Sequence, residues 1–256
     1  MRGLPVHRNV ARLVEVMDDP MCEKLYLVME YAGKPLEPGT LSERECLNVL
    51  TQALEGLAFL HAHGVVHGDL KVEHLLRHDN GRIRIVDFGS SEAFGGGGKR
   101  TGGDDDDLMV RSPGTAAYTA PECCTGQRYH GRKADVWALG MALYVLRYGI
   151  FPFRSSSADD MYEEIRQTRI IAFPSPLESH EESQESKILS LALRKMLEAN
   201  PSARPSADQV LRDLLSNENK DKTEEVSAVP SHISIISTSN VNEIEEAFVR
   251  SMGKKK

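Results

Sequence analysis

The segment HGDLKVEHLL, residues 67–76, holds the densest cluster of chemistry-bearing side chains in the chain. Apolar residues recur at helical spacing before it, and a hairpin pattern follows it, so we expect the segment to lie mainly on a loop. Asp87 follows Asp69 by 18 residues in the sequence Asp87-Phe88-Gly89, where the alternating run 82–86 ends. These two acids are the first candidates for a site.

Three further motifs lie downstream of this pair. GTAAYTAPE spans residues 114–122, DVWALG spans 135–140, and NPSARP spans 200–205. In this order and in these settings, the five motifs resemble the signature set of the eukaryotic protein kinases. Each motif alone is weak evidence, but five in register over residues 10–215 form a specific pattern. The resemblance implies an α+β, protein-kinase-like fold with a mostly helical C-lobe and a truncated β-sheet N-lobe.

Local patterns divide the chain into three regions. We expect residues 1–36 to be a remnant of the N-lobe, with two strands at 10–16 and 25–29 and a hinge. Residues 37–215 are expected to form the C-lobe. Its first helix begins at the capping box of Ser42 and Glu45, and a buried helix spans 133–147. Shorter helices are expected at 161–167, 187–198 and 206–215. Residues 216–256 read as a polar tail with a helix candidate at 242–252.

Composition excludes several classes of protein. The chain has 256 residues, 40% of them hydrophobic, and a net charge of -7. An acidic balance argues against nucleic-acid binding. The longest apolar run, 136–146, is too short to span a membrane, and no secretory signal is visible. The adjacent Cys123 and Cys124 read as free thiols, so we expect a cytoplasmic protein.

The resemblance assigns the catalytic chemistry. Asp69 would accept the proton of the substrate hydroxyl, and Lys71 would neutralise charge on the transferring phosphoryl group. Asp87 would be a hard oxygen ligand for Mg²⁺. Lysine at position 71 is the serine/threonine form of this loop. The implied activity is transfer of the ATP γ-phosphate to protein Ser or Thr, with ATP and Mg²⁺ as cofactors.

The resemblance also assigns binding and structural residues. Met29 would be the gatekeeper, Glu30 and Ala32 would bind adenine through their backbone groups, and Leu76 would lie beneath the ring. Leu13, His67 and Phe88 match members of the family's hydrophobic spine. Glycine at Gly89 lets the chain turn after the metal ligand. Structural roles thus fall on His67, Phe88, Gly89, Glu122 and Arg204 (an ion pair), and Asp135 (an anchor for the catalytic loop).

Three departures from the family pattern stand out. No glycine-rich loop or phosphate-gripping lysine precedes Leu13, so we expect a truncated form of a longer kinase, the alternative being a pseudokinase-like interaction module without catalysis. His74 stands where the family has an asparagine ligand for a second Mg²⁺, and imidazole suits softer metals. Gly68 replaces the arginine that grips an activation-loop phosphate, so control through that contact is not expected.

Within the kinases, residues 7–20 and 106–108 are most similar to the calmodulin-dependent protein kinase kinases. This likeness implies protein substrates, namely activation-loop Ser/Thr residues of another kinase, and makes calmodulin a weakly supported candidate partner. The aspartates 104–107 read as a solvated loop that supplies a fixed negative charge. The segment 241–252 is a candidate regulatory helix, although its acidic character is unlike that of most calmodulin targets.

Overall fold

The structure of the chain is a computed structural model. It describes residues 4–18, 25–94, 107–110, 115–155, 157–174 and 183–227, with side chains described up to residue 217. The chain divides into two compact units, Met1–Asn217 and Glu218–Lys256. All of the candidate site residues belong to the first unit. In the described part of the chain, no helix has the length and apolar character needed to cross a membrane.

Short strands pair in four small antiparallel sheets within the described residues. β1 (Leu13–Asp18) pairs with β2 (Leu25–Met29), and β5 (Leu75–Arg77) lies between β3 (Lys34–Pro35) and β6 (Ile83–Ile85). The other pairs are β4 (Val65–Val66) with β7 (Glu92–Ala93) and β8 (Leu108–Met109) with β9 (Tyr129–His130). Together with the helices, these sheets confirm the expected α+β class.

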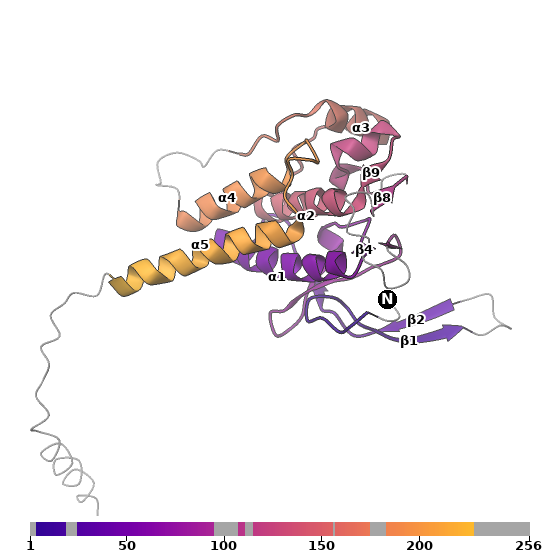
Figure 1. The fold of residues 1–256 in the computed structure, drawn as a ribbon, viewed down its shortest axis with the longest axis horizontal. Helices are drawn as coiled ribbons and strands as arrows, with labels where there is room; N and C mark the ends of the chain where they lie inside the picture. Colours follow the sequence, from indigo (N-terminus) through magenta and orange to yellow (C-terminus); the bar gives the residue numbers. More distant parts are fainter. Residues whose placement is uncertain are drawn as a thin grey trace, which may run out of the picture. The chain divides into compact units, whose positions relative to one another are not determined.

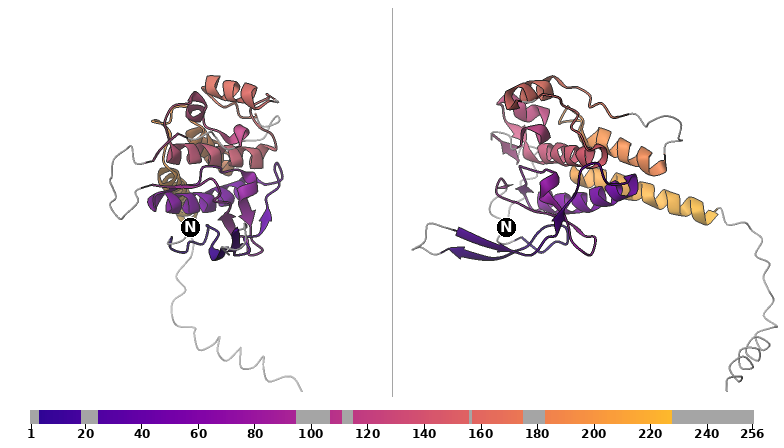
Figure 2. Two further views of the ribbon diagram at one scale, coloured as in Figure 1. Left: turned by 90° about the vertical axis from the view of Figure 1, so that its right-hand side faces the viewer. Right: turned by 180° about the vertical axis from the view of Figure 1, so that it is seen from behind.

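The helices form the body of the first unit. They are α1 (Glu43–Ala62), α2 (Gly131–Tyr148), α3 (Ala158–Gln167), α4 (Gln184–Met196) and the part of α5 (Ala207–Ser227) up to Asn217, with 3-10 turns at Val72–His74, Ala116–Tyr118 and Pro121–Thr125. α1, α2 and α4 contact one another in pairs, and Figures 1 and 2 show α1 and α2 side by side.

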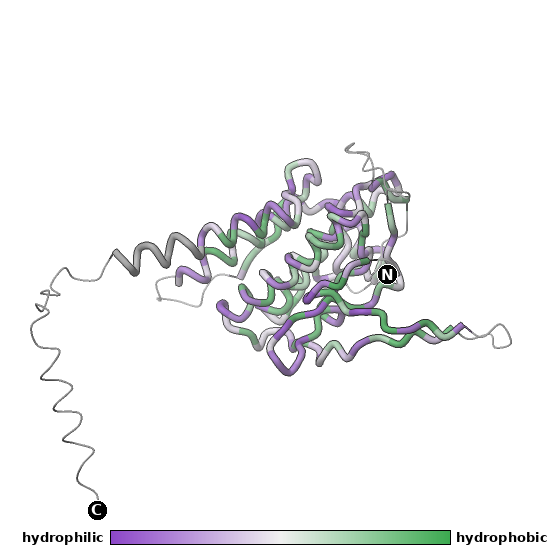
Figure 3. The backbone as a smooth tube through the Cα atoms, turned by 60° about the horizontal axis from the view of Figure 1, so that its bottom comes forward, coloured by the Kyte–Doolittle hydropathy of each residue, from purple (hydrophilic) through white to green (hydrophobic). Residues whose placement is uncertain are grey.

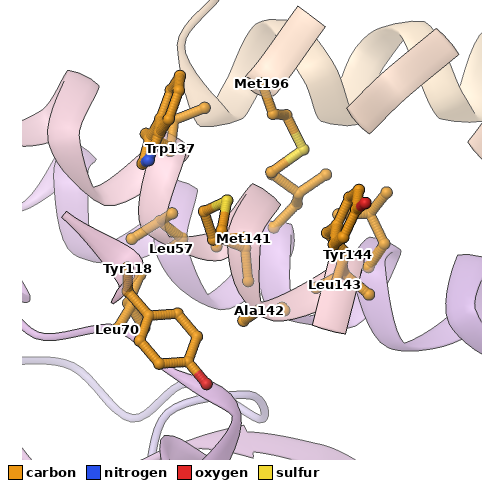
Figure 4. Close-up of a cluster of buried hydrophobic side chains, with 14 of the residues drawn as sticks. Leu57, Leu70, Tyr118, Trp137, Met141, Ala142, Leu143, Tyr144 and Met196 are labelled. Atoms are coloured by element: carbon orange, nitrogen blue, oxygen red, sulfur yellow. The ribbon is translucent and has the colours of Figure 1, made fainter. Parts of the chain in front are cut away.

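The core forms where the apolar faces of these helices meet. Ser42 and Glu45 make the expected capping box at the start of α1, and that helix then buries Cys46, Leu50 and Leu57 at helical spacing. α2 is buried over most of its length and includes the fully buried Trp137. Figure 4 shows the side chains of α2 between Leu57 of α1 and Met196 of α4. This core fixes the loops at the ends of α1 and α2, which carry the candidate site.

The β1–β2 ribbon differs from the body because its apolar side chains remain exposed. Leu25, Leu27 and Val14 are each more than half exposed, as is Tyr26. The ribbon extends away from the helices in Figures 1 and 2, and it is largely hydrophobic along its length in Figure 3. Strong β propensity and direct pairing therefore define this ribbon, with little burial to stabilise it.

Two expectations about local structure were wrong. α5 continues to Ser227, well past residue 215, because the charged helix formers after Leu215 extend it beyond its apolar pattern. Asp107 is 4% exposed, whereas the aspartate run predicted a solvated loop. The rest of that run, 104–106, and the tail candidates at 241–252 lie outside the described residues.

Candidate active site

Asp135 anchors the loop that carries Asp69. The Asp135 carboxylate, in the second turn of α2, accepts the backbone N–H of His67 at 2.8 Å and that of Gly68 at 2.9 Å. His61, in the last turn of α1, contacts the same carboxylate through Nε2 at 2.9 Å. Asp135 is buried, so these contacts compensate for burying its charge. The sequence indicated the role of Asp135 but missed His61, whose only signal was its place near the end of a predicted helix.

Gly68 allows the sharp turn before Asp69. Its φ is +79°, a region that residues with a side chain rarely adopt. A Cβ placed there would lie 2.6 Å from the backbone oxygen of Ser90. The backbone itself therefore selects glycine at position 68, where the family resemblance leads one to expect arginine.

His67 is fully buried beneath the catalytic loop. Its Nε2 lies 2.9 Å from the carbonyl oxygen of Val86, which can only accept, so Nε2 carries the proton. Its Nδ1 accepts the backbone N–H of Asp69 at 3.3 Å. Burial lowers the pKa of His67, which fits the neutral ring that both contacts require. The Phe88 ring lies 5.2 Å away, centroid to centroid, so two of the three expected spine residues are in contact.

Asp69, Lys71 and Thr115 form one polar cluster. One oxygen of Asp69, Oδ1, accepts the backbone N–H of Thr115 at 3.0 Å and its hydroxyl at 3.1 Å. The Lys71 ammonium lies 3.3 Å from Oδ2 of Asp69 and donates to the Thr115 hydroxyl at 3.2 Å. Burial by itself raises the pKa of Asp69, but the Thr115 hydrogen bonds and the Lys71 charge outweigh it and lower the pKa below its usual value. Asp69 is thus held as a carboxylate.

Thr115 is the residue of this cluster that sequence reasoning missed. It belongs to the motif GTAAYTAPE, one of the five motifs that carry the family resemblance, but no local pattern places it against Asp69. The contact joins positions 46 residues apart. Only the tertiary fold brings them together.

Asp87 lies at the exposed edge of the same site. Its backbone has a φ of 61°, and its Oδ1 accepts the backbone N–H of Gly89 at 3.1 Å. His74 connects it to the catalytic loop: Nδ1 contacts the carbonyl oxygen of Asp69 at 2.7 Å, and Nε2 lies 3.2 Å from Oδ2 of Asp87. The backbone of Asp69 and the carboxylate of Asp87 thus contact opposite sides of one imidazole ring.

These contacts bear on how the site would hold Mg²⁺. The Asp87 side chain is 60% exposed and offers hard carboxylate oxygens, which fit a Mg²⁺ ligand. His74 fits poorly: its Nδ1 faces a carbonyl oxygen and so carries a proton, while its Nε2 faces the carboxylate of Asp87. Nδ1 is therefore engaged by the protein backbone, and Nε2 is directed at the same carboxylate that would bind the metal.

The residues expected to bind adenine lie around the hinge between β2 and β3. Met29 ends β2, and the backbone of Glu30 pairs with Arg12 of the neighbouring chain segment, its N–H donating to the Arg12 oxygen at 3.0 Å. Ala32 is buried, and Leu76 on β5 pairs with Pro35 on β3. The fold thus places Leu76 on the strand that neighbours the hinge segment.

Glu122 and Arg204 meet in the body of the first unit. Arg204 is fully buried and binds Glu122 bidentately, with N–O distances of 2.6 and 2.9 Å. The Arg204 guanidinium also donates to the carbonyl oxygens of Glu198 and Lys133 and lies over the ring of Trp137. This fully bonded arrangement joins the turn at Pro121–Thr125 to the loop before α5.

Fold and site define the class of protein. The sequence model of the protein kinase domain matches residues 1–215. The chain therefore belongs to the protein kinase family, in agreement with the motifs and with the α+β fold.

Several curated proteins are similar to this chain. The serine/threonine-protein kinase GRIK1 of Arabidopsis thaliana is 42% identical over 64% of this chain and 41% of its own length. The CBL-interacting serine/threonine-protein kinase 7 of the same plant is 34% identical over 83% of the chain and 47% of its own length. Serine/threonine-protein kinase TOS3 of Saccharomyces cerevisiae is 30% identical over 77% of this chain and 39% of its own length. The chain thus spans less than half the length of these relatives.

The names of these relatives agree with the serine/threonine type that Lys71 indicated. None of the three is named a calmodulin-dependent protein kinase kinase. The narrower likeness to that subfamily is therefore not confirmed by them.

Proposed function

We propose that this chain is the catalytic region of a serine/threonine protein kinase, which transfers the ATP γ-phosphate to protein Ser or Thr. The observation that carries the proposal is the cluster at Asp69, whose carboxylate is held ionised beside Lys71 and Thr115. A non-catalytic interaction module has no need of an ionised carboxylate and an ammonium group held together on a half-buried loop. The matches to named kinases likewise favour catalysis over that alternative.

The proposed roles follow from this geometry. Asp69 orients the substrate hydroxyl and accepts its proton, for which Oδ2 is available on the side of Lys71. The Lys71 ammonium, 3.3 Å from that oxygen, neutralises charge on the phosphoryl group in transfer. Asp87 holds Mg²⁺, which supplies charge neutralisation on the ATP phosphates when it is bound. Adenine binds to the backbone of Glu30 and Ala32, between Met29 and Leu76.

The remaining features of the proposal concern substrates and surroundings. We propose that the substrates include activation-loop Ser/Thr residues of another kinase, which rests on the resemblance of residues 7–20 and 106–108 to upstream activating kinases. Free thiols at Cys46, Cys123 and Cys124 support a reducing, cytoplasmic location. Calmodulin is a candidate partner through the segment 241–252, which lies outside the described residues.

A direct test compares wild type with Asp69→Asn. The 256-residue chain is incubated with Mg²⁺ and radiolabelled ATP on a library of Ser- and Thr-containing peptides. We expect Asp69→Asn to lower the transfer rate by about 10²–10⁴-fold, the usual contribution of a positioned general base. Asparagine can still accept from Thr115, so the fold should persist.

The matched control is Asp79→Asn, on the exposed hairpin turn between β5 and β6, which should transfer at the wild-type rate. Undiminished transfer by Asp69→Asn would refute the assigned mechanism. A wild-type chain that binds Mg·ATP without any transfer would instead favour the interaction module.

A further inference from the structure

Asp107 caps helix α2 from a distant part of the sequence. Its Oδ2 accepts the backbone N–H of Arg132 at 2.8 Å, and its backbone oxygen accepts that of Gly131 at 3.0 Å. Its Oδ1 lies 2.9 Å from Nδ1 of His130. His130, the residue in the N-cap position, makes no capping hydrogen bond with its own side chain. Asp107 therefore supplies both the acceptors and the negative charge that the first turn of a helix favours.

Leu108 and Met109, which follow Asp107, are fixed by pairing and packing. Leu108 and Met109 form β8, which pairs with β9 just before α2 (Figure 1). Met109 is 3% exposed, and a Cβ on Gly131 would lie 2.4 Å from its sulfur atom. The absence of a side chain at Gly131 thus creates the space that Met109 fills.

This anchored piece adjoins the catalytic cluster. Met109 and Gly131 line the same cavity as Asp69 and Thr115. Thr115, the partner of Asp69, follows Asp107 by only eight residues. The strand that follows Asp107 therefore borders the cavity that Asp69 and Thr115 share.

Gly68, next to Asp69, has no side chain that could bind a phosphate group on this segment. The positive φ of Gly68 and the approach of the Ser90 oxygen oppose any side chain there. The anchoring charge in this chain is instead a built-in carboxylate, buried against α2.

We propose that Asp107 is a positioning residue that holds β8 at the N-terminus of α2, without phosphorylation, and thereby keeps Met109 at the cavity where Thr115 contacts Asp69. It does so by capping α2 and binding His130, and the consequence is a cavity wall that supports the contact between Thr115 and Asp69 constitutively. We call the contacts of Asp107 with His130, Gly131 and Arg132 the clasp. The inference rests on the proposed kinase function only in its effect on rate, since the clasp itself is a property of the fold.

Hydrogen exchange measured by mass spectrometry tests the clasp without reference to catalysis. In Asp107→Ala we expect the amides of Leu108–Val110 and of Gly131 and Arg132 to exchange about tenfold faster, the scale of a lost capping interaction. Asp107→Asn should retain most of the protection, because its amide oxygen can accept from Arg132 and its NH₂ can donate to His130. Asp105→Ala is the matched control from the same aspartate run.

Kinase assays on the same variants test the positioning role. We expect Asp107→Ala to lower kcat about tenfold with little change in the KM for ATP, and Asp107→Asn to restore kcat. Equal exchange in Asp107→Ala and Asp105→Ala would overturn the clasp, whatever the activity. Faster exchange with an unchanged kcat would overturn the positioning role. A wild type without activity would count against the proposed function, while the exchange data would still decide the clasp.

Discussion

Thr115 donates both its backbone N–H and its hydroxyl to a single oxygen of Asp69. The second oxygen of Asp69 lies beside the Lys71 ammonium. The carboxylate plane is therefore set by residues from two segments, and one oxygen is committed to structure while the other is left for chemistry. Because Thr115 orients the carboxylate of Asp69, we expect the rate of phosphoryl transfer to depend on Thr115, even though its hydroxyl is not expected to react.

Replacing Thr115 tests this division. In Thr115→Val the hydroxyl bonds to Asp69 and Lys71 are lost while the side-chain volume is kept. We expect kcat/KM to fall about tenfold, the scale of one hydrogen bond to a charged group. Thr115→Ser keeps the hydroxyl and should retain most of the activity. Steady-state kinetics with a fixed peptide substrate measure both variants, and equal losses in the two would contradict a role for the hydroxyl.

His74 is predicted to restrain the metal site. Because its Nε2 lies 3.2 Å from the Asp87 carboxylate, Mg²⁺ and His74 compete for the same oxygen. His74→Asn replaces the imidazole with an oxygen ligand that Mg²⁺ prefers. We expect half-maximal activity at a Mg²⁺ concentration several-fold lower than in wild type, and chelation of the metal should abolish transfer in both. An unchanged Mg²⁺ requirement would show that His74 does not limit metal binding.

The Arg204–Glu122 pair is predicted to contribute strongly to stability. Arg204→Met leaves the Glu122 carboxylate without its partner and removes two further hydrogen bonds to carbonyl oxygens. Breaking a buried pair in this way costs about 3–5 kcal/mol in the free energy of unfolding. Arg212→Met removes an exposed pair with Asp208 and should cost less than about 1 kcal/mol. Urea unfolding followed by circular dichroism measures both, and similar losses would contradict the prediction.

His67 is predicted to make stability depend on pH near neutrality. Burial lowers its pKa below the ordinary value of 6.5, so the native state keeps the ring neutral while the unfolded chain takes up a proton. The contribution of His67 to the free energy of unfolding is therefore fully present above pH 6.5. It is lost as the pH falls from 6.5 toward the lowered pKa of His67 in the native state. Asp69 also has a lowered pKa, but its contribution is lost only below its ordinary value of 3.8.

Thermal unfolding between pH 7.5 and 5.5 measures this effect. We expect the melting temperature of wild type to fall with pH, and to fall less steeply in His67→Phe, which carries no titrating ring. His63→Gln, an exposed residue near the end of α1, serves as the control and should follow the wild-type slope. A His67→Phe slope equal to that of wild type would assign the pH dependence to other groups.

Local sequence signals predicted much of the fold. The capping box at Ser42 and Glu45 fixed the start of α1, the turn 79–81 predicted the β5–β6 hairpin, and the apolar run after Asp135 predicted α2. In each case the signal and the structure lie within a few residues of one another. The motifs also predicted the family, because their order along the chain is itself a strong constraint.

The parts that escaped prediction depend on contacts between distant residues. The acidic residues next to Asp107 in the sequence predict a solvated side chain, and only the approach of Asp107 to the N-terminus of α2 buries it. Thr115 reaches Asp69, and His61 reaches Asp135, across separations that no local pattern encodes. The roles of Met29, Ala32 and Leu76 in nucleotide binding remain predictions, since they rest on the family resemblance.

The exposed β1–β2 ribbon has a practical consequence for the purified protein. Leu25, Tyr26 and Leu27 present consecutive apolar side chains on a strand with open backbone edges, a combination that promotes association between molecules. We therefore expect the association of this chain in solution to depend mainly on the exposed apolar residues of this one hairpin. Sedimentation velocity over a range of concentrations should reveal the association, and Leu27→Lys should shift the population toward the monomer without touching the catalytic cluster.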